Sequence, residues 1–215
     1  MTERRRLLVL GTRDFSFEIA ELAEETGAYE VTAFVENQSR ERALETLEGR
    51  PIVWIDDVDE FADTHVAVCG LGTTKRRLFV EQAAAHGLRF ATVIHPSARL
   101  PRSASVGEGT ILSAGVVVGT RAMLGRHVFL NRGALIGHHT TLGDYVSVMP
   151  GANVAGFCSI GEAAYIAVGA VVVDRVAIGD GALVAAGAVV VADVPAHAQV
   201  MGVPARVVKE SIAPR

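Results

Sequence analysis

An aliphatic residue recurs at every sixth position through the central part of this chain, from Ile94 to Val190. All seventeen positions of the series hold Ile, Leu or Val, and from the second onward a small side chain lies two residues earlier, as at Ala98 and Ala188. A period of six fits neither the 3.6 residues per turn of an α-helix nor the irregular alternation of a β-sandwich. It predicts a parallel β-helix with three flat sides, in which one hexapeptide forms each side and eighteen residues form each coil.

A second period, of eighteen residues, is carried by glycines that each follow an aliphatic position. We expect the aliphatic side chains to stack inside the coils and the small side chains to fit the tight corners. We expect the glycines to allow unusual backbone angles at one corner of each coil, because glycine lacks the Cβ atom that restricts other residues. The glycines are Gly107, Gly125, Gly143, Gly161 and Gly179.

The first ninety residues follow a different rhythm, in which short apolar segments alternate with segments of helical spacing. Strands are predicted at residues 7–10, 31–35, 52–55 and 66–69, and helices at 15–26 and 75–86. This order favours an α/β fold, a small Rossmann-like and mostly parallel sheet with helices packed on it. The predicted parts are an α/β domain (1–92), an all-β solenoid domain (93–195) and a tail on the last coil (196–215).

The chain of 215 residues is mildly acidic, with a formal net charge of −4. This charge argues against nucleic acid as a partner, since the only basic run is Arg4-Arg5-Arg6. No segment approaches the ~20 apolar residues of a membrane helix, and no export signal is recognised. Cys69 and Cys158 are interpreted as buried thiols of a reducing compartment. These features predict a cytoplasmic protein with no membrane partner.

Ligands of open α/β sheets bind beyond the carboxyl ends of the strands. In this chain those ends carry residues 11–14, 36–37 and 70–75. The first segment precedes a predicted helix, whose free amide groups favour an anion such as a diphosphate. It lacks the G-x-G-x-x-G fingerprint, so a dinucleotide cofactor is not predicted. Ordinary turns with helix-capping residues are the alternative interpretation.

Two adjacent histidines, His138 and His139, stand out among the polar residues of the repeat. Because Ile136 points inward, His138 falls just past a corner, and imidazole is suited to act as a general base near neutral pH. Gly156 follows eighteen residues later, so we expect it beside His138 on the next coil, where its unobstructed N–H is suited to stabilise an oxyanion. The alternatives are a pair of surface histidines and a metal site completed by His127 across a subunit interface.

The predicted solenoid has no bulky insertion to cover its three flat, partly apolar sides. A prism with three sides associates naturally around a threefold axis, which predicts a homotrimer. The grooves between neighbouring subunits are places where a ligand can bind.

Several motifs together give the chain a resemblance to a known family. They are Ala33-Phe34-Val35-Glu36-Asn37, the segment from Gly70 to Arg77, the segment from Val93 to Ala98, Asn131 seven residues before His138, and Gly202-Val203-Pro204-Ala205-Arg206. With them the chain resembles, over almost its whole length, bacterial sugar acyltransferases of the left-handed β-helix class. That family includes bacillosamine-pathway N-acetyltransferases and the sialic-acid O-acetyltransferase-like group. Hexapeptides alone specify only the architecture, and the α/β domain and the Asn–His spacing make the likeness more specific.

The resemblance implies transfer of an acetyl group from acetyl-CoA to the amino group of a sugar, sometimes to a hydroxyl, with the sugar commonly carried on a nucleotide diphosphate. It implies His138 as the catalytic base; His139 and Asn131 would position this base or the sugar. The N-terminal domain would bind the nucleotide-linked sugar through Gly11, Thr12, Arg13, Glu36, Asn37, Gly72, Thr73 and Arg77. Coenzyme A would lie between neighbouring solenoids near Gly156, Val168, Ala186, Pro204 and Arg206, and no metal is expected.

Three positions differ from the usual pattern of the family. The first loop, Gly11 to Asp14, is less rich in glycine, His139 replaces an acidic partner of the base, and Ser147 replaces a second histidine that often contacts the acetyl group. Two other functions are open. One is a hydrolyase of the γ-carbonic-anhydrase type, which requires a transition metal and three histidines at a subunit boundary. The other is a scaffold that binds a nucleotide sugar without catalysis.

Overall fold

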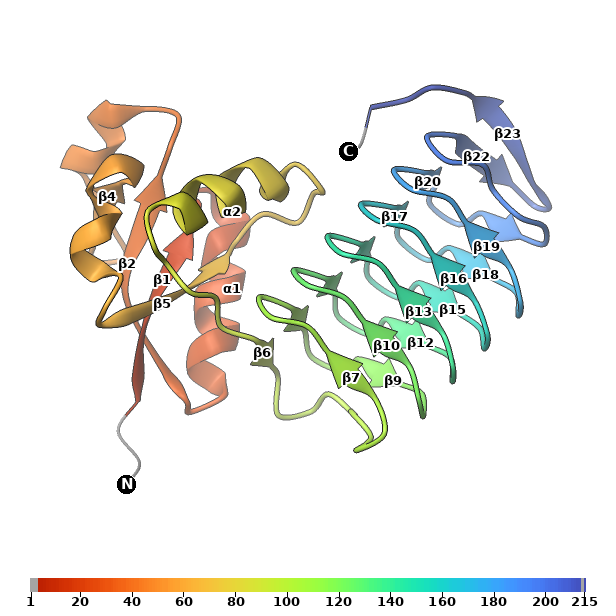
Figure 1. Ribbon diagram of the computed structural model, residues 1–215, viewed down its shortest axis with the longest axis horizontal. Coiled ribbons are helices and arrows are strands. Elements are labelled where there is room, and N and C mark those ends of the chain that lie inside the picture. The colour runs from red at the N-terminus through yellow and green to blue at the C-terminus, as the bar shows by residue number, and fades with distance from the viewer. Residues whose placement is uncertain (1–3, 214) are drawn as a thin grey trace. The chain divides into compact units, whose positions relative to one another are not determined.

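A computed structural model describes residues 4–213 and 215 of the protein (Figure 1). The chain divides into two compact units, with the boundary between Val93 and Ile94. The first unit is α/β and the second is built from stacked short strands. Within the described residues, no helix is both long enough and apolar enough to cross a membrane.

The first unit contains one five-stranded sheet in the order β3-β4-β2-β1-β5. Its elements are β1 (Arg5–Leu10), α1 (Asp14–Glu25), β2 (Tyr29–Glu36), the 3₁₀ helix η1 (Arg40–Leu44), β3 (Thr46–Leu47), β4 (Arg50–Trp54), the 3₁₀ helix η2 (Ile55–Phe61), β5 (His65–Cys69) and α2 (Arg76–Ala85). Only β3 pairs antiparallel among the described strands of this sheet. The predicted Rossmann-like parallel sheet is confirmed.

The sequence of β1 explains its central place in this sheet. Its last four residues, from Leu7 to Leu10, are fully buried and apolar on both faces, as expected of a parallel strand covered on both sides. The helix α1 buries Ile19, Leu22 and Ala23, which share one face at helical spacing. The order of the strands therefore places the carboxyl ends of β1, β2 and β5 at one edge.

The second unit is a left-handed parallel β-helix, whose stacked coils are visible in Figure 1. Its strands are two residues long: β6 (Val93–Ile94), β7 (Ser105–Val106), β8 (Ile111–Leu112), β9 (Val117–Val118), β10 (Met123–Leu124), β11 (Phe129–Leu130), β12 (Leu135–Ile136), β13 (Thr141–Leu142), β14 (Ser147–Val148), β15 (Asn153–Val154), β16 (Ser159–Ile160), β17 (Tyr165–Ile166), β18 (Val171–Val172), β19 (Ala177–Ile178), β20 (Leu183–Val184) and β21 (Val189–Val190). Every third strand pairs in parallel, as β12 does with β15, at an offset of eighteen residues. This repeat produces three sheets.

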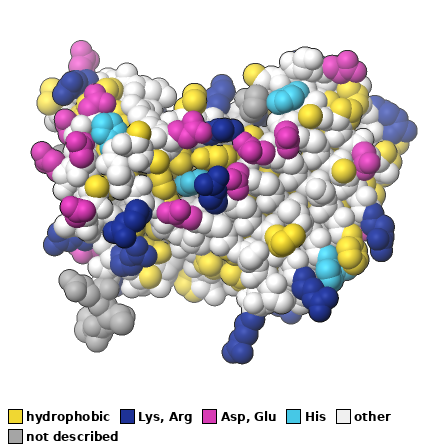
Figure 2. All heavy atoms as spheres, in the orientation of Figure 1, with side chains coloured by type: hydrophobic (Ala, Val, Ile, Leu, Met, Phe, Trp, Pro, Cys, Tyr) yellow, Lys and Arg dark blue, Asp and Glu magenta, His cyan; other side chains and the backbone are white. Residues whose placement is uncertain are grey.

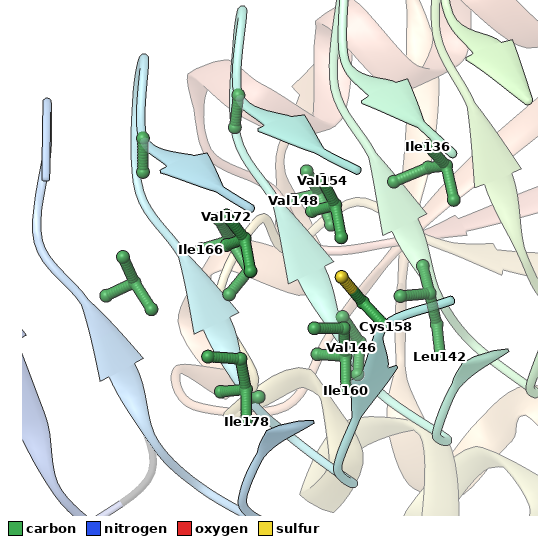
Figure 3. Packing of buried hydrophobic residues seen from close by; sticks show 14 of the residues in the cluster. Ile136, Leu142, Val146, Val148, Val154, Cys158, Ile160, Ile166, Val172 and Ile178 are labelled. Carbon is green, nitrogen blue, oxygen red and sulfur yellow. The ribbon is translucent and has the colours of Figure 1, made fainter. Parts of the chain in front are cut away.

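The aliphatic series forms the core of the solenoid. In each two-residue strand the second residue points inward, so that Ile136, Val154 and Val172 are buried on successive coils (Figure 3). From β8 to β21 the residue before each strand is also buried, and Ala134 and Ala152 are fully enclosed there. Because the interior is filled by aliphatic side chains from three sides, it is a packed core and holds no channel.

The prediction for the glycines with a period of eighteen is wrong. These glycines do not have positive φ angles; the left-handed conformation falls at the third residue after an aliphatic position, as at His139 (φ 59°) and Phe157 (φ 59°). Glycine is required by the close approach of adjacent coils: a Cβ atom on Gly107 would lie 2.5 Å from the carbonyl carbon of Gly125. The eighteen-residue spacing correctly placed these glycines at one corner of each coil. The short distance between adjacent coils explains why glycine is needed there.

The chain ends in a hairpin that extends one sheet of the solenoid. Its strands are β22 (Gln199–Gly202), parallel to β20, and β23 (Ala205–Lys209), antiparallel to β22. The amide of Ala185 donates to the carbonyl of Val200, so the hairpin continues the coil register.

Candidate active site

The carboxyl ends of β1, β2 and β5 surround a hollow of about 260 Å³ in the first unit. Seven of the eight residues predicted to bind the sugar nucleotide line it: Gly11, Thr12, Arg13, Glu36, Asn37, Gly72 and Thr73. Phe15, Leu71 and Phe79 add apolar surface. Arg77 is not among the lining residues, and its Nε donates to Glu81 Oε1 at 2.7 Å on the surface of α2.

Glu36 ties the loops around this hollow together. Its carboxylate accepts a hydrogen bond from the Thr12 hydroxyl and two from the backbone amides of Asn37 (2.9 Å) and Gln38 (2.7 Å). Arg42 reinforces the arrangement by donating to the carbonyl of Thr12 at 3.0 Å. Because both carboxylate oxygens already accept hydrogen bonds from the protein, Glu36 is better suited to shaping the hollow than to contacting a ligand.

Burial alone would raise the pKa of Glu36. The hydrogen bonds from Thr12 and from the backbone of Gln38 and Asn37 outweigh burial and hold this pKa below its ordinary value. The side chain is therefore ionised at neutral pH, and its charge is neutralised locally by donors.

Two glycines let the loops after β1 and β5 lie close to Ser16, near the start of α1. Gly11 has a φ angle of 117°, and a Cβ atom there would lie 2.5 Å from the Ser16 hydroxyl. A Cβ atom on Gly70 would lie 2.8 Å from Cα of Ser16. The hollow therefore borders the start of α1, where free backbone N–H groups favour an anion.

The two cysteines are buried, as the sequence predicts, and do not pair. Burial raises the pKa of the Cys69 thiol to about 11. A thiol with such a pKa is protonated at neutral pH and is a poor nucleophile.

In the second unit, His138 and His139 lie in the turn between β12 and β13. Their Nδ1 atoms are 3.0 Å apart, so one of the two atoms donates a proton and the other accepts it. His138 is exposed and His139 is half-buried. The hydrogen bond fixes the His138 ring so that its other nitrogen, Nε2, is available to a ligand.

Gly156 lies beside His138 on the adjacent coil. A Cβ atom on Gly156 would lie 2.9 Å from both Nε2 and Cε1 of His138, so a side chain at this position would push the imidazole out of its present place. Among the described residues, the Gly156 amide donates to no protein acceptor. This arrangement places a potential base and a free N–H donor side by side.

Two residues that the sequence reasoning missed complete this corner. The Phe157 ring stacks on His139, with 4.7 Å between the ring centres, and meets the His138 ring edge-on at 5.0 Å. Arg175 lies one coil after Phe157, and its guanidinium is 4.6 Å from the centre of the Phe157 ring. The period of eighteen was the available signal, because Phe157 and Arg175 follow His139 by one coil and two coils.

Asn131 lies apart from the histidines within one chain. It is buried in the turn after β11, one corner before the turn that carries His138, and its Oδ1 accepts from the backbone amide of Arg132 at 2.7 Å. Ser147 is fully buried in β14. A single chain therefore does not bring Asn131 or Ser147 to the His138 corner.

The residues predicted to bind coenzyme A lie at two corners of the solenoid. Val168 and Ala186 are exposed and stack on adjacent coils after β17 and β20, and Pro204 and Arg206 belong to the hairpin that continues this sheet. Gly156 lies at the corner after β15. One chain does not bring these two groups together.

The part of the chain that the structure describes contains no group of three or more His, Cys, Asp or Glu side chains arranged to hold a metal ion. His127 lies at a third corner, where its ring stacks on Tyr145 at 5.1 Å.

A parallel β-helix preceded by a Rossmann-like sheet, with a hollow at the strand ends and a histidine corner on the coils, defines the acyltransferase class of left-handed β-helix proteins. Neither a family model nor a curated protein matches the chain significantly. Solved structures do. The acetyltransferase domain of PglB from Neisseria gonorrhoeae is 30% identical, over 95% of this chain and 100% of that one, with a TM-score of 0.86. The chain belongs to the hexapeptide-repeat sugar acetyltransferases.

Two further structures are similar over nearly their full length. PerB from Caulobacter crescentus, in complex with CoA and GDP-perosamine, is 29% identical over 97% of this chain and 99% of that one, with a TM-score of 0.86. WeeI from Acinetobacter baumannii is 26% identical over 95% of this chain and 100% of that one, with a TM-score of 0.86. The PglB domain has also been solved in complex with acetyl coenzyme A.

Proposed function

We propose that this acetyltransferase moves the acetyl group of acetyl-CoA to the amino group of a nucleotide-linked sugar. The similar PglB domain binds acetyl coenzyme A, and the similar PerB binds CoA and GDP-perosamine. The observation that carries the proposal is the pairing of His138 with the bare amide of Gly156 on adjacent coils.

His138 acts as the general base in this proposal. When its Nδ1 donates the proton of the 3.0 Å hydrogen bond to His139, its Nε2 is unprotonated and accepts a proton from the acceptor amine. This proton leaves as the amine nitrogen forms its bond to the carbonyl carbon of acetyl-CoA. As the C–S bond breaks, the proton passes to the sulfur, and coenzyme A leaves as the thiol.

The Gly156 amide stabilises the oxyanion that forms on the acetyl carbonyl. Its N–H is free of protein acceptors in the described residues, and it lies beside the ring that performs the proton transfer. Because a thioester is already activated, orientation and one proton transfer are sufficient for direct transfer without an acyl-enzyme.

His139 takes the place of an acidic partner. Its Nδ1 accepts the hydrogen bond from the Nδ1–H of His138 and fixes the orientation of that ring. It adds no negative charge, so it stabilises a protonated His138 less than a carboxylate would.

The first unit binds the nucleotide in this proposal. The start of α1 and the loops at Gly11 and Gly72 receive the diphosphate, and Arg13 at the exposed edge of the hollow contributes positive charge. Phe15 and Phe79 provide apolar surface for the base or ribose.

Coenzyme A binds between two subunits of a homotrimer in this proposal. The corner that carries Val168 and Ala186 and the corner that carries Gly156 lie apart in one chain. A threefold assembly places one subunit's corner opposite a different corner of its neighbour, so both groups can border one groove. The same groove can bring Asn131 of one subunit towards His138 of another.

The test measures thiol release from acetyl-CoA with a panel of nucleotide-linked amino sugars, and matched nucleotide sugars without the amine as controls. Release with an amino sugar and none with its hydroxyl counterpart supports N-acetylation. Release with the hydroxyl sugars assigns O-acetylation. If no acceptor supports release while nucleotide sugars raise the melting temperature and acetyl-CoA does not, the protein is a binding scaffold and the proposal fails.

A further inference from the structure

The basic run Arg4-Arg5-Arg6 plays no part in the proposed reaction. It begins β1 at the amino edge of the sheet, where Arg6 is in register with His65 at the start of β5. Together with Arg89 these residues surround a hollow of about 400 Å³. The nucleotide pocket borders the carboxyl ends of the same strands, so the length of β1, roughly 17 Å, separates the two hollows.

Positive charge is concentrated in this hollow although the whole chain is acidic. Four arginines line it, against one carboxylate, that of Asp63. Within residues 4–213 and 215, no carboxylate forms an ion pair with Arg5, Arg6 or Arg89. Figure 2 shows dark blue side chains gathered on the face where β1 begins. Such unpaired like charges repel one another, and a bound anion would relieve this repulsion.

One side chain that lines the hollow, that of His65, is polar and buried. His65 is 7% exposed, its Nδ1 is 2.8 Å from the hydroxyl of Thr64, and its ring packs edge-on against Phe61 at 5.0 Å. Burial, and next the charge of Arg6, lower the pKa of His65, so its ring is neutral at pH 7. The positive charge of the hollow therefore comes from the guanidinium groups alone.

Guanidinium groups bind phosphate oxygens through two parallel hydrogen bonds, which makes several unpaired arginines around one hollow a phosphate-recognition surface. We propose that the hollow bounded by Arg5, Arg6, His65 and Arg89 binds a phosphate-bearing anion at a site separate from the nucleotide pocket. The phosphate belongs either to a free oligophosphate or to the headgroup of a lipid.

Isothermal titration of the full chain with inorganic pyrophosphate tests the site. The double variant Arg5→Ser/Arg89→Ser should weaken binding at least tenfold, and Arg89→Ser alone should weaken it less. The matched control Arg102→Ser removes an exposed arginine of the solenoid and should leave binding unchanged. Arg13→Ser, at the nucleotide pocket, should weaken only the pyrophosphate binding at that pocket and leave in place the binding that Arg5→Ser/Arg89→Ser weakens. Thermal melts check that each variant folds.

Co-sedimentation with vesicles that contain phosphatidic acid identifies the source of the phosphate. Binding of vesicles that disappears in Arg5→Ser/Arg89→Ser assigns the site to a lipid headgroup, and binding of pyrophosphate alone assigns it to a free ligand. The proposal is overturned if neither probe binds, if the double variant binds both probes as the wild type does, or if Arg13→Ser abolishes the pyrophosphate binding.

Discussion

His138 is the residue on which the proposed chemistry depends, because its Nε2 is the nitrogen next to Gly156. His138→Ala should lower turnover by roughly 10²–10⁴, the range expected when a general base is lost. Steady-state thiol release measures the effect. His86→Ala, which removes a partly exposed histidine beside Asp59 in the first unit, is the control and should retain full turnover. Turnover near the wild-type value in His138→Ala would remove the assignment.

Phe157 positions the histidine pair through its two ring contacts. Phe157→Leu keeps apolar bulk but removes the stacking, so kcat should fall by roughly 2–10-fold, in line with the energy of an aromatic pair. The ring proton resonances of both histidines should shift as well, because they lose the ring current of the phenyl group. Met123→Leu, which changes another exposed apolar side chain of the solenoid, is the control. An unchanged kcat in a folded variant would show that the stacking is incidental.

Glu36 stabilises the first unit through hydrogen bonds that require its ionised form. Its pKa is lower in the folded state than in the unfolded chain, so its contribution is complete above the ordinary carboxyl pKa of about 4.3 and is lost as the pH falls through the lower folded value. Glu36→Gln should cost about 1–3 kcal/mol at pH 7. Urea unfolding at a series of pH values measures this difference, with the exposed Glu60→Gln as control. A cost that does not shrink in acid would contradict the ionic origin.

At the scale of the coil, the distance between adjacent turns decides where glycine is needed. Gly107→Ala should destabilise the protein by about 1–3 kcal/mol, since its Cβ would collide with the backbone at Gly125 and force the coils apart. Gly133→Asn is the matched comparison: Gly133 has a φ of 67° and open space around it, and asparagine tolerates this conformation. Thermal unfolding should separate the two variants. Equal costs would mean that contact between coils is not the reason for glycine.

The elements could be predicted where one physical rule decided them. The series from Ile94 to Val190 predicted the three-sided coil, because sides of six residues place one aliphatic side chain of each side in the core. The backbone angle of Gly107 could not be predicted, since spacing carries no information about φ. Phe157 has no titratable or polar group, and its contact with His139 follows from the sequence only through the eighteen-residue spacing between them.

The candidate site was predictable to the extent that its residues share a corner. A separation of eighteen returns to the same corner, and so the sequence pointed to Gly156 beside His138. The seven residues from Asn131 to His138 lead to the next corner, and the twelve from Gly156 to Val168 cross two sides. In the proposed homotrimer, contacts between such positions would come from a neighbouring subunit, and the repeat does not specify how that neighbour is placed.

At the scale of the whole molecule, the proposed groove requires an assembly. The sheet that contains β12 and β18 exposes Leu135 (39%) and Val171 (37%) at its outward positions. If the proposed trimer forms, Leu135→Lys/Val171→Lys should convert it to monomers and abolish thiol release, because desolvating the new charges in an apolar contact is costly. Light scattering after gel filtration measures the mass. Thr141→Lys, on a different sheet, is the control, and monomers with full activity would contradict the shared groove.

The eighteen-residue register also limits how the length of such a molecule can change. Removing one full coil of eighteen residues keeps the strands on both sides of the deletion in register. Removing four or five residues would instead shift the later positions, so that inward-facing side chains no longer face the core. A homologous solenoid that is shorter or longer is therefore expected to differ by whole coils of eighteen residues. Loss of a whole coil at either end of the solenoid would leave His138 beside Gly156, whereas loss of the coil between these two residues would remove the pair.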